Sequence, residues 1–191
     1  MASDTRDRLV RATSRLLRTQ GYTATGLNQV MAEADAPKGS MYFHFPGGKE
    51  ELAAAAVNRF ADRATARMAR YLEDHDTVAG AVHAILDAYV VHMDRTGYDE
   101  GCAVASVALD GAATHAALGQ ATREALVAWT DMIAAALEAE GRAPEQAHAL
   151  ATLVIACLEG TIVMAKGEQS TEPIATTRDT LQALLAAPAG S

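Results

Sequence analysis

Two short helical patterns meet at a proline within residues 21–52, and this arrangement constrains the fold more than any other feature of the chain. Apolar residues recur at spacings of three and four from Leu27 to Met31, which predicts an amphipathic helix. Pro37 has no amide hydrogen and restricts the residue before it, so it separates this helix from the next one. Residues 46–48 are Pro-Gly-Gly and end the second helix after about two turns.

This pattern predicts a helix-turn-helix, because two helices joined by a turn of about three or four residues form that motif. The second helix of such a motif can enter the major groove of DNA. Thr25 precedes the first helix, and we expect its hydroxyl to cap that helix. The apolar residues of the second helix are Met41, Phe43 and Phe45, and we expect all three to pack inside.

Charge is distributed unevenly along the 191 residues. The formal net charge of −8 by itself argues against a generic nucleic-acid binder. Residues 1–70, however, hold eleven Lys or Arg and seven Asp or Glu, a net charge of +4, whereas residues 71–191 carry −12. A basic head suits DNA binding because phosphate contacts dominate affinity, and the acidic remainder also serves solubility.

The rest of the chain reads as helix. Alanine is abundant and only 5% of residues are aromatic, which favours helix over strand. Further helices are predicted over residues 4–20, 48–72, 78–96, 101–111, 114–140, 144–167 and 174–185, with Asp76 or Thr77 as a cap. We therefore expect an all-α fold of about nine helices.

Residues 144–167 are apolar almost all round, so this helix must be buried on several sides. In a chain of this length a second subunit is the simplest cover. We expect a homodimer through residues 144–167 and 174–186. Two copies would present two DNA-reading helices about 34 Å apart, which implies a palindromic operator.

The sequence also bears on compartment. No apolar run approaches the roughly twenty residues of a membrane span, and arginines interrupt the apolar residues near the N-terminus, so we expect neither a membrane contact nor a secretory signal. Cys102 and Cys157 are far apart and form no CxxC pair. A reducing, cytoplasmic location fits this cysteine usage better than a disulfide scaffold.

Residues 21–52 resemble the DNA-binding domain of the TetR family of transcriptional regulators. The matching features are the Gly21-Tyr22 pair, Thr25, the turn Lys38-Gly39-Ser40, the run Tyr42-Phe43-His44-Phe45, and Lys49-Glu50-Glu51-Leu52. The resemblance implies a three-helix helix-turn-helix DNA-binding domain over residues 1–49. It also implies a C-terminal ligand-binding and dimerisation domain over 50–186, followed by a flexible tail over 187–191.

The resemblance and the side-chain chemistry together assign DNA contacts. Lys38 and Ser40 can reach base edges or phosphates, and Tyr42 carries its hydroxyl on a rigid arm that suits a phosphate. Lys49 begins a helix, where a cation is favourable only if an anion such as phosphate lies there too. The predicted DNA-binding residues are Thr25, Lys38, Gly39, Ser40, Tyr42, His44 and Lys49. Plain surface solvation is the alternative for each polar residue.

Residues 101–111 resemble a branch of the same family that includes multidrug- and flavonoid-responsive repressors, in which a similar Gly-Cys-x-Val segment begins the sixth helix. This resemblance implies a cavity for an apolar or aromatic inducer that releases the DNA. The candidate lining residues are Phe60, Tyr89, Met93, Cys102, Ser106, Leu109, Trp129, Met132, Ile133 and Leu158. For any single one of them, plain core is the more frequent role. Repressor is favoured over activator by the family alone.

Three other classes of function remain open in the sequence. One is an interaction module that has lost DNA binding, and Lys38, Tyr42 and Lys49 argue against it. An enzyme is disfavoured, because the six histidines are scattered and no GxSxG, HExxH or phosphate-binding glycine loop occurs. A redox- or metal-responsive DNA-binding regulator is the alternative, through Cys102 and Cys157 or through His83 and Asp87, which share a helix face. We expect no catalytic residue, no cofactor and no metal.

Overall fold

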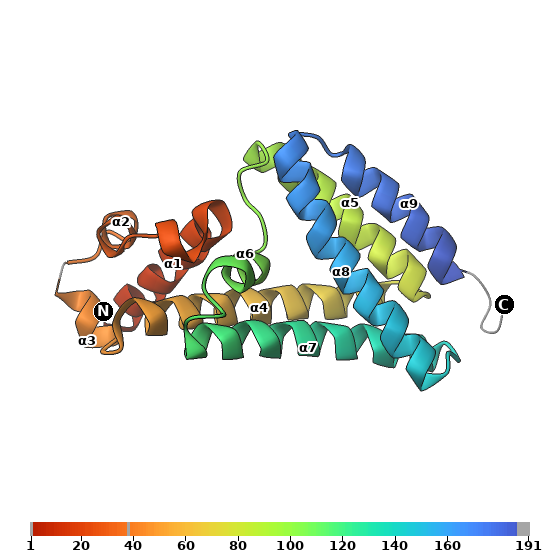
Figure 1. Ribbon diagram of the computed structural model, residues 1–191, viewed down its shortest axis with the longest axis horizontal. Coiled ribbons are helices and arrows are strands. Elements are labelled where there is room, and N and C mark those ends of the chain that lie inside the picture. Colours follow the sequence, from red (N-terminus) through yellow and green to blue (C-terminus); the bar gives the residue numbers. More distant parts are fainter. Residues whose placement is uncertain (1, 38, 187–191) are drawn as a thin grey trace. The chain divides into compact units, whose positions relative to one another are not determined.

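The computed structural model describes residues 2–37 and 39–186, with side chains described from Asp4 onward. This part of the chain contains nine helices and no strand, so the predicted all-α fold is confirmed (Figure 1). The helices are α1 (Ala2–Ala24), α2 (Leu27–Glu33), α3 (Ser40–His44), α4 (Gly48–Asp74), α5 (Val78–Thr96), α6 (Ala103–Asp110), α7 (Ala116–Ala139), α8 (Pro144–Glu168) and α9 (Glu172–Ala186).

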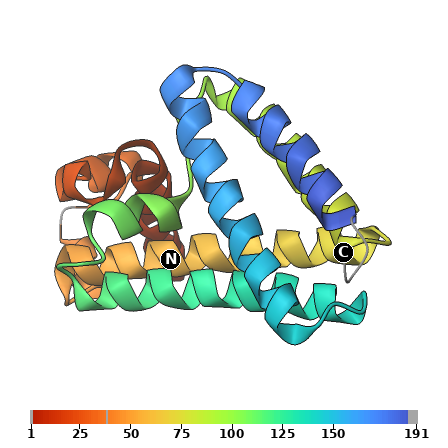
Figure 2. The same cartoon turned by 45° about the vertical axis from the view of Figure 1, so that its right-hand side comes forward.

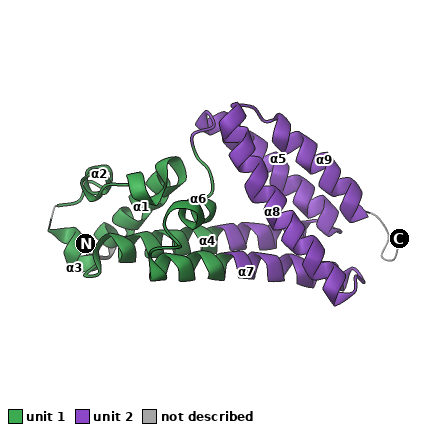
Figure 3. Cartoon of the chain, viewed as in Figure 1, with its two compact units in different colours: residues 1–63, 100–125 green, residues 64–99, 126–191 purple. Residues whose placement is uncertain are grey.

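The chain forms two compact units, coloured separately in Figure 3. Unit 1 comprises Met1–Arg63 and Glu100–Ala125, and unit 2 comprises Ala64–Asp99 and Leu126–Ser191. The division falls inside α4 and inside α7. It shows that α6 and the first part of α7 belong to the same compact unit as the helix-turn-helix. The functional domains 1–49 and 50–186 remain a prediction, and the predicted tail 187–191 lies outside the described residues.

Unit 1 has its core where α1 meets α2, α3 and α6. Leu9, Leu17, Val30, Met41 and Phe45 are almost fully buried there. The first helix extends to Ala24, beyond its predicted end, but it is broken at Gly21, whose φ of 78° and ψ of −177° are not helical. That φ lies in the region where glycine alone has no steric penalty.

Thr25 does not cap α2, contrary to our expectation. The N-cap of α2 is Gly26, and no side chain caps it. The Thr25 hydroxyl instead donates to the Gly21 carbonyl at 2.5 Å, and the side chain is buried. The reason is local, because the break at Gly21 leaves that carbonyl without its helical partner and the nearby hydroxyl supplies one.

Helix ends in unit 2 follow the sequence closely. Thr77 caps α5 by accepting from the Gly80 amide at 3.1 Å, as expected, and Gly97 closes the same helix in the left-handed conformation with φ 58°. Pro144 opens α8, where its missing amide hydrogen costs nothing. The core of unit 2 includes Leu86 and Ile162.

Helix α9 packs against α5 and α8 in unit 2, as Figure 2 shows from a second direction. Helix α8 buries one face but exposes Leu153, Val163 and Met164 on another. Ala156 and Gly160 are exposed on that same face at helical spacing. We refer to Leu153, Ala156, Gly160, Val163 and Met164 as the α8 stripe.

The expectation that no apolar stretch reaches the length of a membrane span does not hold for α8. This helix is long and apolar enough to cross a membrane by length and composition, with a mean hydropathy of 1.8 over its most apolar window. The sequence had shown no such run because Glu159 and Lys166 interrupt the apolar letters. A core helix of a soluble protein passes the same test, so this finding is weak evidence for a membrane.

Candidate DNA-binding surface

Helix α3 presents one face to solvent and one to the core. Met41 and Phe45 are each 1% exposed and anchor the helix against unit 1, whereas Tyr42 and Phe43 are 61% and 76% exposed. The Ser40 hydroxyl donates to the Pro37 carbonyl at 2.7 Å and so completes the turn before α3. A helix that is anchored on one side and exposed on the other has a face free to enter the major groove, where Phe can contact a thymine methyl group.

Phe43 corrects the expectation that it packs inside. The pattern from Met41 to Phe45 places the two buried residues four positions apart, which is one helical turn, and Phe43 falls on the opposite side. Its ring lies edge-on to His44, with centroids 5.0 Å apart and planes at 82°. The sequence carries no signal for this position, because hydrophobicity alone does not show which side of a short helix a residue occupies.

The other residues of the motif are placed less uniformly. Gly39 is the N-cap of α3, and a Cβ at this position would meet nothing within 4 Å, so the backbone is open to an approaching ligand. The predicted contact of Lys38 lies outside the described residues. The assignments of Thr25, Gly39, Ser40, Tyr42 and His44 to DNA therefore stay predictions.

Lys49, in the first turn of α4, reaches the end of α1 with its side chain. Its ammonium is 4.2 Å from the centroid of the Tyr22 ring and 3.4 Å from the Thr23 carbonyl. Burial lowers the pKa of Lys49, and the negative charge of Asp110 opposes that shift. Burial raises the pKa of the Tyr22 hydroxyl, and Glu50 and Asp110 raise it further. The ammonium thus contacts an aromatic face and a carbonyl, whereas burial disfavours its charged form.

Two carboxylates of unit 1 accept hydrogen bonds from distant backbone amides. Asp110, the last residue of α6, accepts from the Tyr22 amide at 3.2 Å and from the Thr23 amide at 2.9 Å. Glu50, in the first turn of α4, accepts from the Ala117 amide at 3.0 Å. Both contacts join segments more than sixty positions apart. Nothing in the sequence pattern pointed to them, because neither segment carries a signal for its partner.

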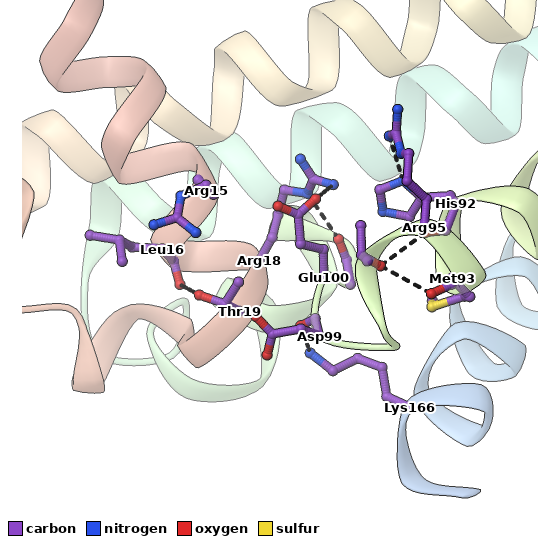
Figure 4. Close-up of polar contacts among 12 residues, drawn as sticks. Arg15, Leu16, Arg18, Thr19, His92, Met93, Arg95, Asp99, Glu100 and Lys166 are labelled. Carbon is purple, nitrogen blue, oxygen red and sulfur yellow. Dashed lines mark hydrogen bonds and ion pairs between the residues drawn. The ribbon is translucent and has the colours of Figure 1, made fainter. Parts of the chain in front are cut away.

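Arginines of α1 form further contacts within unit 1. Arg15 pairs with Glu33 of α2, and Arg11 pairs with Asp7 on its own helix. Figure 4 shows the Arg18 guanidinium pairing with Glu100. The Arg18 Nε also donates to the Gly101 carbonyl at 3.3 Å, and the Gly101 amide donates to the Arg18 carbonyl at 3.0 Å.

The predicted inducer residues fall in both units. Phe60, Cys102, Ser106 and Leu109 belong to unit 1, and the other six belong to unit 2: Tyr89, Met93, Trp129, Met132, Ile133 and Leu158. Met93, Trp129, Ile133 and Leu158 are buried, whereas Leu109 is 80% exposed. The indole N–H of Trp129 donates to the Thr65 hydroxyl at 2.9 Å, so its polar edge is satisfied.

Among the surface grooves formed by the described residues of unit 1, two contain no inducer candidate in their lining. The larger, about 420 Å³, lies between α1 and α4 and is lined largely by charged side chains such as Arg6, Asp7 and Arg59. The smaller, about 260 Å³, lies between α1 and α2 and includes Arg8 and Glu33. The inducer assignment therefore stays a prediction.

The residues of the alternative regulators are engaged in other ways. Burial raises the pKa of the Cys157 thiol, which disfavours the reactive thiolate. His83 contacts Gln182 at 2.6 Å and Asp87 at 3.3 Å, and Asp87 in turn pairs with Arg178 at 2.7 Å. Within the described ranges, 2–37 and 39–186, no group of three or more His, Cys, Asp or Glu is placed to hold a metal ion.

A short helix with one buried and one exposed side, set in a basic helical head, is typical of a helix-turn-helix transcriptional regulator. Family comparisons agree with this class. Residues 9–56 match the family described as bacterial regulatory proteins of the tetR family, and residues 78–180 match the LmrA/YxaF-like C-terminal domain of transcriptional regulators. The chain belongs to the TetR family of transcriptional regulators.

Similar proteins extend over nearly the whole chain. The HTH-type transcriptional regulator LmrA of Bacillus subtilis is 33% identical over 171 residues, which are 90% of this chain and 91% of LmrA. YxaF of the same organism is 31% identical and covers 90% of each chain. The crystal structure of regulatory protein TetR from Rhodobacter sphaeroides has a TM-score of 0.83 at 23% identity, covering 93% of this chain and 96% of that one, which shows the shared fold.

Proposed function

We propose that the protein is a repressor that binds a palindromic DNA operator as a homodimer and is released by a small apolar or aromatic inducer. The observation that carries the dimer is the α8 stripe. Three exposed aliphatic side chains share one helix face with Ala156 and Gly160, which let a second helix approach closely. Such a face on a regulator is best covered by its own copy.

The stripe explains the near-continuous apolar pattern of residues 144–167. One side of α8 packs inside unit 2 through residues such as Val154 and Ile162, and the stripe is exposed on a different side. In the homodimer the stripes of two copies, with residues 174–186 beside them, cover each other. The C-terminal family match, to a domain of transcriptional regulators, covers α8 and the first part of α9, as far as residue 180.

DNA reading is proposed for the exposed side of α3. The Tyr42 hydroxyl contacts a phosphate and fixes the helix in the groove, while the Phe43 ring packs against the methyl group of a thymine. Gly39 lets the backbone approach, Ser40 and His44 flank the aromatic pair, and Lys38 and Lys49 supply positive charge. The net charge of +4 over residues 1–70 supports this arrangement.

Selection from a random DNA pool tests the proposal. We expect enrichment of one sequence with two-fold symmetry, bound by a species of twice the monomer mass of 20.0 kDa in sedimentation. A monomer at micromolar concentration that binds heparin as well as any duplex would contradict it.

The inducer site is proposed within the buried apolar groups of unit 2, around Met93, Trp129 and Ile133. Methionine adapts to varied shapes and tryptophan offers a flat face to an aromatic ring, which suits an apolar inducer. A ligand that prefers the released state must weaken DNA binding by the same factor by which DNA weakens its own binding.

Trp129 offers a direct readout, because it is the only tryptophan in the sequence and is buried. Titration with a panel of apolar aromatic compounds should change its fluorescence and weaken binding to the selected duplex at the same ligand concentrations. A Trp129→Phe variant should lose the optical signal, and weaker ligand-dependent release in this variant would agree with contact between Trp129 and the ligand. No change in duplex affinity across a broad panel would contradict induction.

A cytoplasmic location and the absence of enzyme activity are part of the proposal, supported by the relatives, which are named as transcriptional regulators. The redox or metal alternative is not adopted. The raised pKa of Cys157 and the contacts of His83 and Asp87 within α5 and α9 both disfavour it. Duplex binding that is unchanged by oxidant or by chelator would agree with this choice.

A further inference from the structure

The segment from Glu100 to Ala117 is fastened to the helix-turn-helix at several points within unit 1. Before α6, the Arg18 side chain pairs with Glu100, and the backbones of Arg18 and Gly101 are hydrogen-bonded at 3.0 Å. At the end of α6, Asp110 accepts the Tyr22 and Thr23 amides. Helix α6 therefore has both of its ends tied to the last turns of α1.

Asp110 contacts the chain next to the break in α1, where the chain changes direction. Gly21 leaves helical geometry there, with φ 78°, and the next residues lead into α2. A break of this kind exposes backbone amides that lack helical partners. Two of them, those of Tyr22 and Thr23, point at one carboxylate, and each takes a separate oxygen. A charged acceptor makes each of these bonds stronger than a neutral one would.

Close packing around the same turn leaves little freedom. A Cβ placed on Gly21 would lie 2.7 Å from Asp110 Oδ2, so a side chain at this position would displace the Asp110 carboxylate, and the positive φ also favours glycine. Tyr22 is buried, and its ring lies edge-on to His115 with centroids 4.8 Å apart. A second contact has the acceptor and donor exchanged between the two segments: Glu50, at the start of α4, accepts from the Ala117 amide of α7. The turn and the α6–α7 corner thus hold each other.

We propose that Asp110 is a positioning residue for DNA binding: its carboxylate, by holding the Tyr22 and Thr23 amides, fixes the angle at which the chain leaves α1 and so the orientation of α2 and α3. The side chain acts through the backbone and does not touch DNA. This inference rests on the proposed DNA binding by α3. It makes α6, which lies outside the helix-turn-helix in sequence, part of the DNA-binding head.

The sign of the effect separates positioning from electrostatics. Removing a negative charge from a DNA-binding head should strengthen binding, because phosphate contacts dominate affinity. Positioning predicts the opposite for Asp110→Ala. A turn that samples other angles lowers the equilibrium population of the binding-competent conformation, and this lowers the apparent affinity of every folded molecule. Glu124→Ala is the matched control, because Glu124 is an exposed carboxylate of unit 1 whose described contact is to Gln120 of its own helix.

The experiment measures affinity for the duplex that the wild-type protein selects from a random pool, with the active fraction determined by stoichiometric titration. For Asp110→Ala we expect binding weaker by about tenfold, at an unchanged active fraction, since two charge-assisted hydrogen bonds are lost. Asp110→Asn keeps one acceptor oxygen and should show a smaller loss. Glu124→Ala should bind equally well or slightly more tightly. Gly21→Ala should resemble Asp110→Ala.

Amide hydrogen exchange on the full chain supplies a readout that does not need DNA. Tyr22 and Thr23 should exchange faster in Asp110→Ala, and Ala117 should exchange faster in Glu50→Ala but not in Glu50→Gln, which keeps its acceptor. If the wild-type protein selects no duplex, the proposed function fails, and faster exchange at Tyr22 and Thr23 still supports the clamp.

Two results would overturn the inference. One is an Asp110→Ala variant that binds the duplex as tightly as the Glu124→Ala control. The other is a variant whose active fraction falls while the active molecules keep wild-type affinity, because that is loss of folding and not of positioning.

Discussion

Helices α3 and α8 both expose apolar side chains, yet the two surfaces differ in kind. The exposed residues of α3 are aromatic, Tyr42 and Phe43, and they sit among polar neighbours in the basic part of the chain. The α8 stripe is aliphatic, and small residues separate its members at helical spacing. An aromatic ring with a polar partner suits a groove that is part base and part phosphate, whereas aliphatic groups beside Ala and Gly suit another helix.

The difference teaches that exposure of apolar residues identifies a binding surface but not its partner. The partner follows from what surrounds the apolar groups: charge and hydroxyls around α3, and methyl groups and bare backbone around the α8 stripe. Substitutions on the two helices should therefore fail in different ways. Those on α8 should change assembly, and those on α3 should change DNA binding without changing assembly.

The largest effect is expected on the α8 stripe. Val163→Glu combined with Met164→Glu places two like charges in each copy of the proposed interface, and burying unpaired charges is costly. Sedimentation should show a monomer, and affinity for the selected duplex should fall by about a hundredfold or more, because two half-sites are no longer held together. Val127→Glu, on an exposed position of α7, is the control and should stay dimeric. A double variant that remains dimeric would remove the stripe from the interface.

The second largest effect is expected from removal of the Tyr42 hydroxyl. Tyr42→Phe removes only the hydroxyl and should weaken duplex binding by about tenfold, which corresponds to the loss of one hydrogen bond to a charged group. The variant should sediment like the wild type. Equal affinity of Tyr42→Phe and wild type at low salt would show that the hydroxyl makes no phosphate contact.

Phe43 should have a smaller and sequence-dependent effect. Phe43→Ala should weaken binding to the selected duplex by about fivefold and reduce the preference for thymine at one position of each half-site, because an apolar contact with the methyl group is lost. The stability of the fold should be unchanged, since the ring is 76% exposed. Replacing that thymine by uracil in the duplex should reproduce the loss for wild type and add nothing for Phe43→Ala. Uniform weakening on all sequences would contradict base contact.

The smallest effect concerns Cys157, which lies on α8 but is half-buried beside the stripe. Burial raises the pKa of its thiol, so the neutral form is favoured in the folded state. Alkylation should therefore be slower than for a cysteine in an unfolded peptide at pH 8, and it should speed up only as pH rises above the ordinary thiol pKa. Stability should be insensitive to this group at neutral pH and fall at alkaline pH, because the unfolded chain loses its proton first. The rate of alkylation by iodoacetamide, compared with that of the denatured protein, checks the expected slowing. Urea denaturation at neutral and at alkaline pH checks the expected fall in stability.

Sequence patterns predicted the helices well because local signals set their ends. Thr77, Gly97 and Pro144 each act within a turn or two of their own position, and the structure places helix ends at all three. The short helices of the motif were less exact. Helix α3 covers only Ser40–His44, and the phase of so short a helix depends on what it packs against, which is why Phe43 was misplaced.

Contacts between distant segments escaped prediction altogether. Thr25 looked like a cap because its own neighbourhood suggests one, but the break at Gly21 supplied a competing acceptor. The pairing of Asp110 with the Tyr22 and Thr23 amides depends on how α6 packs against α1, and no residue near either segment encodes that. Local rules therefore locate α3, the helix proposed to read DNA, whereas its support comes from tertiary packing.

The central claim is that the exposed face of α3 reads DNA in two copies joined through α8. Selection of duplexes from a random pool, repeated with the wild-type protein and with the Val163→Glu, Met164→Glu variant, tests it most directly. The account predicts that the wild type enriches a sequence with two-fold symmetry whose half-sites lie about one helical turn or a multiple of it apart, and that the variant enriches none. Enrichment of a single, asymmetric site by both proteins would contradict it.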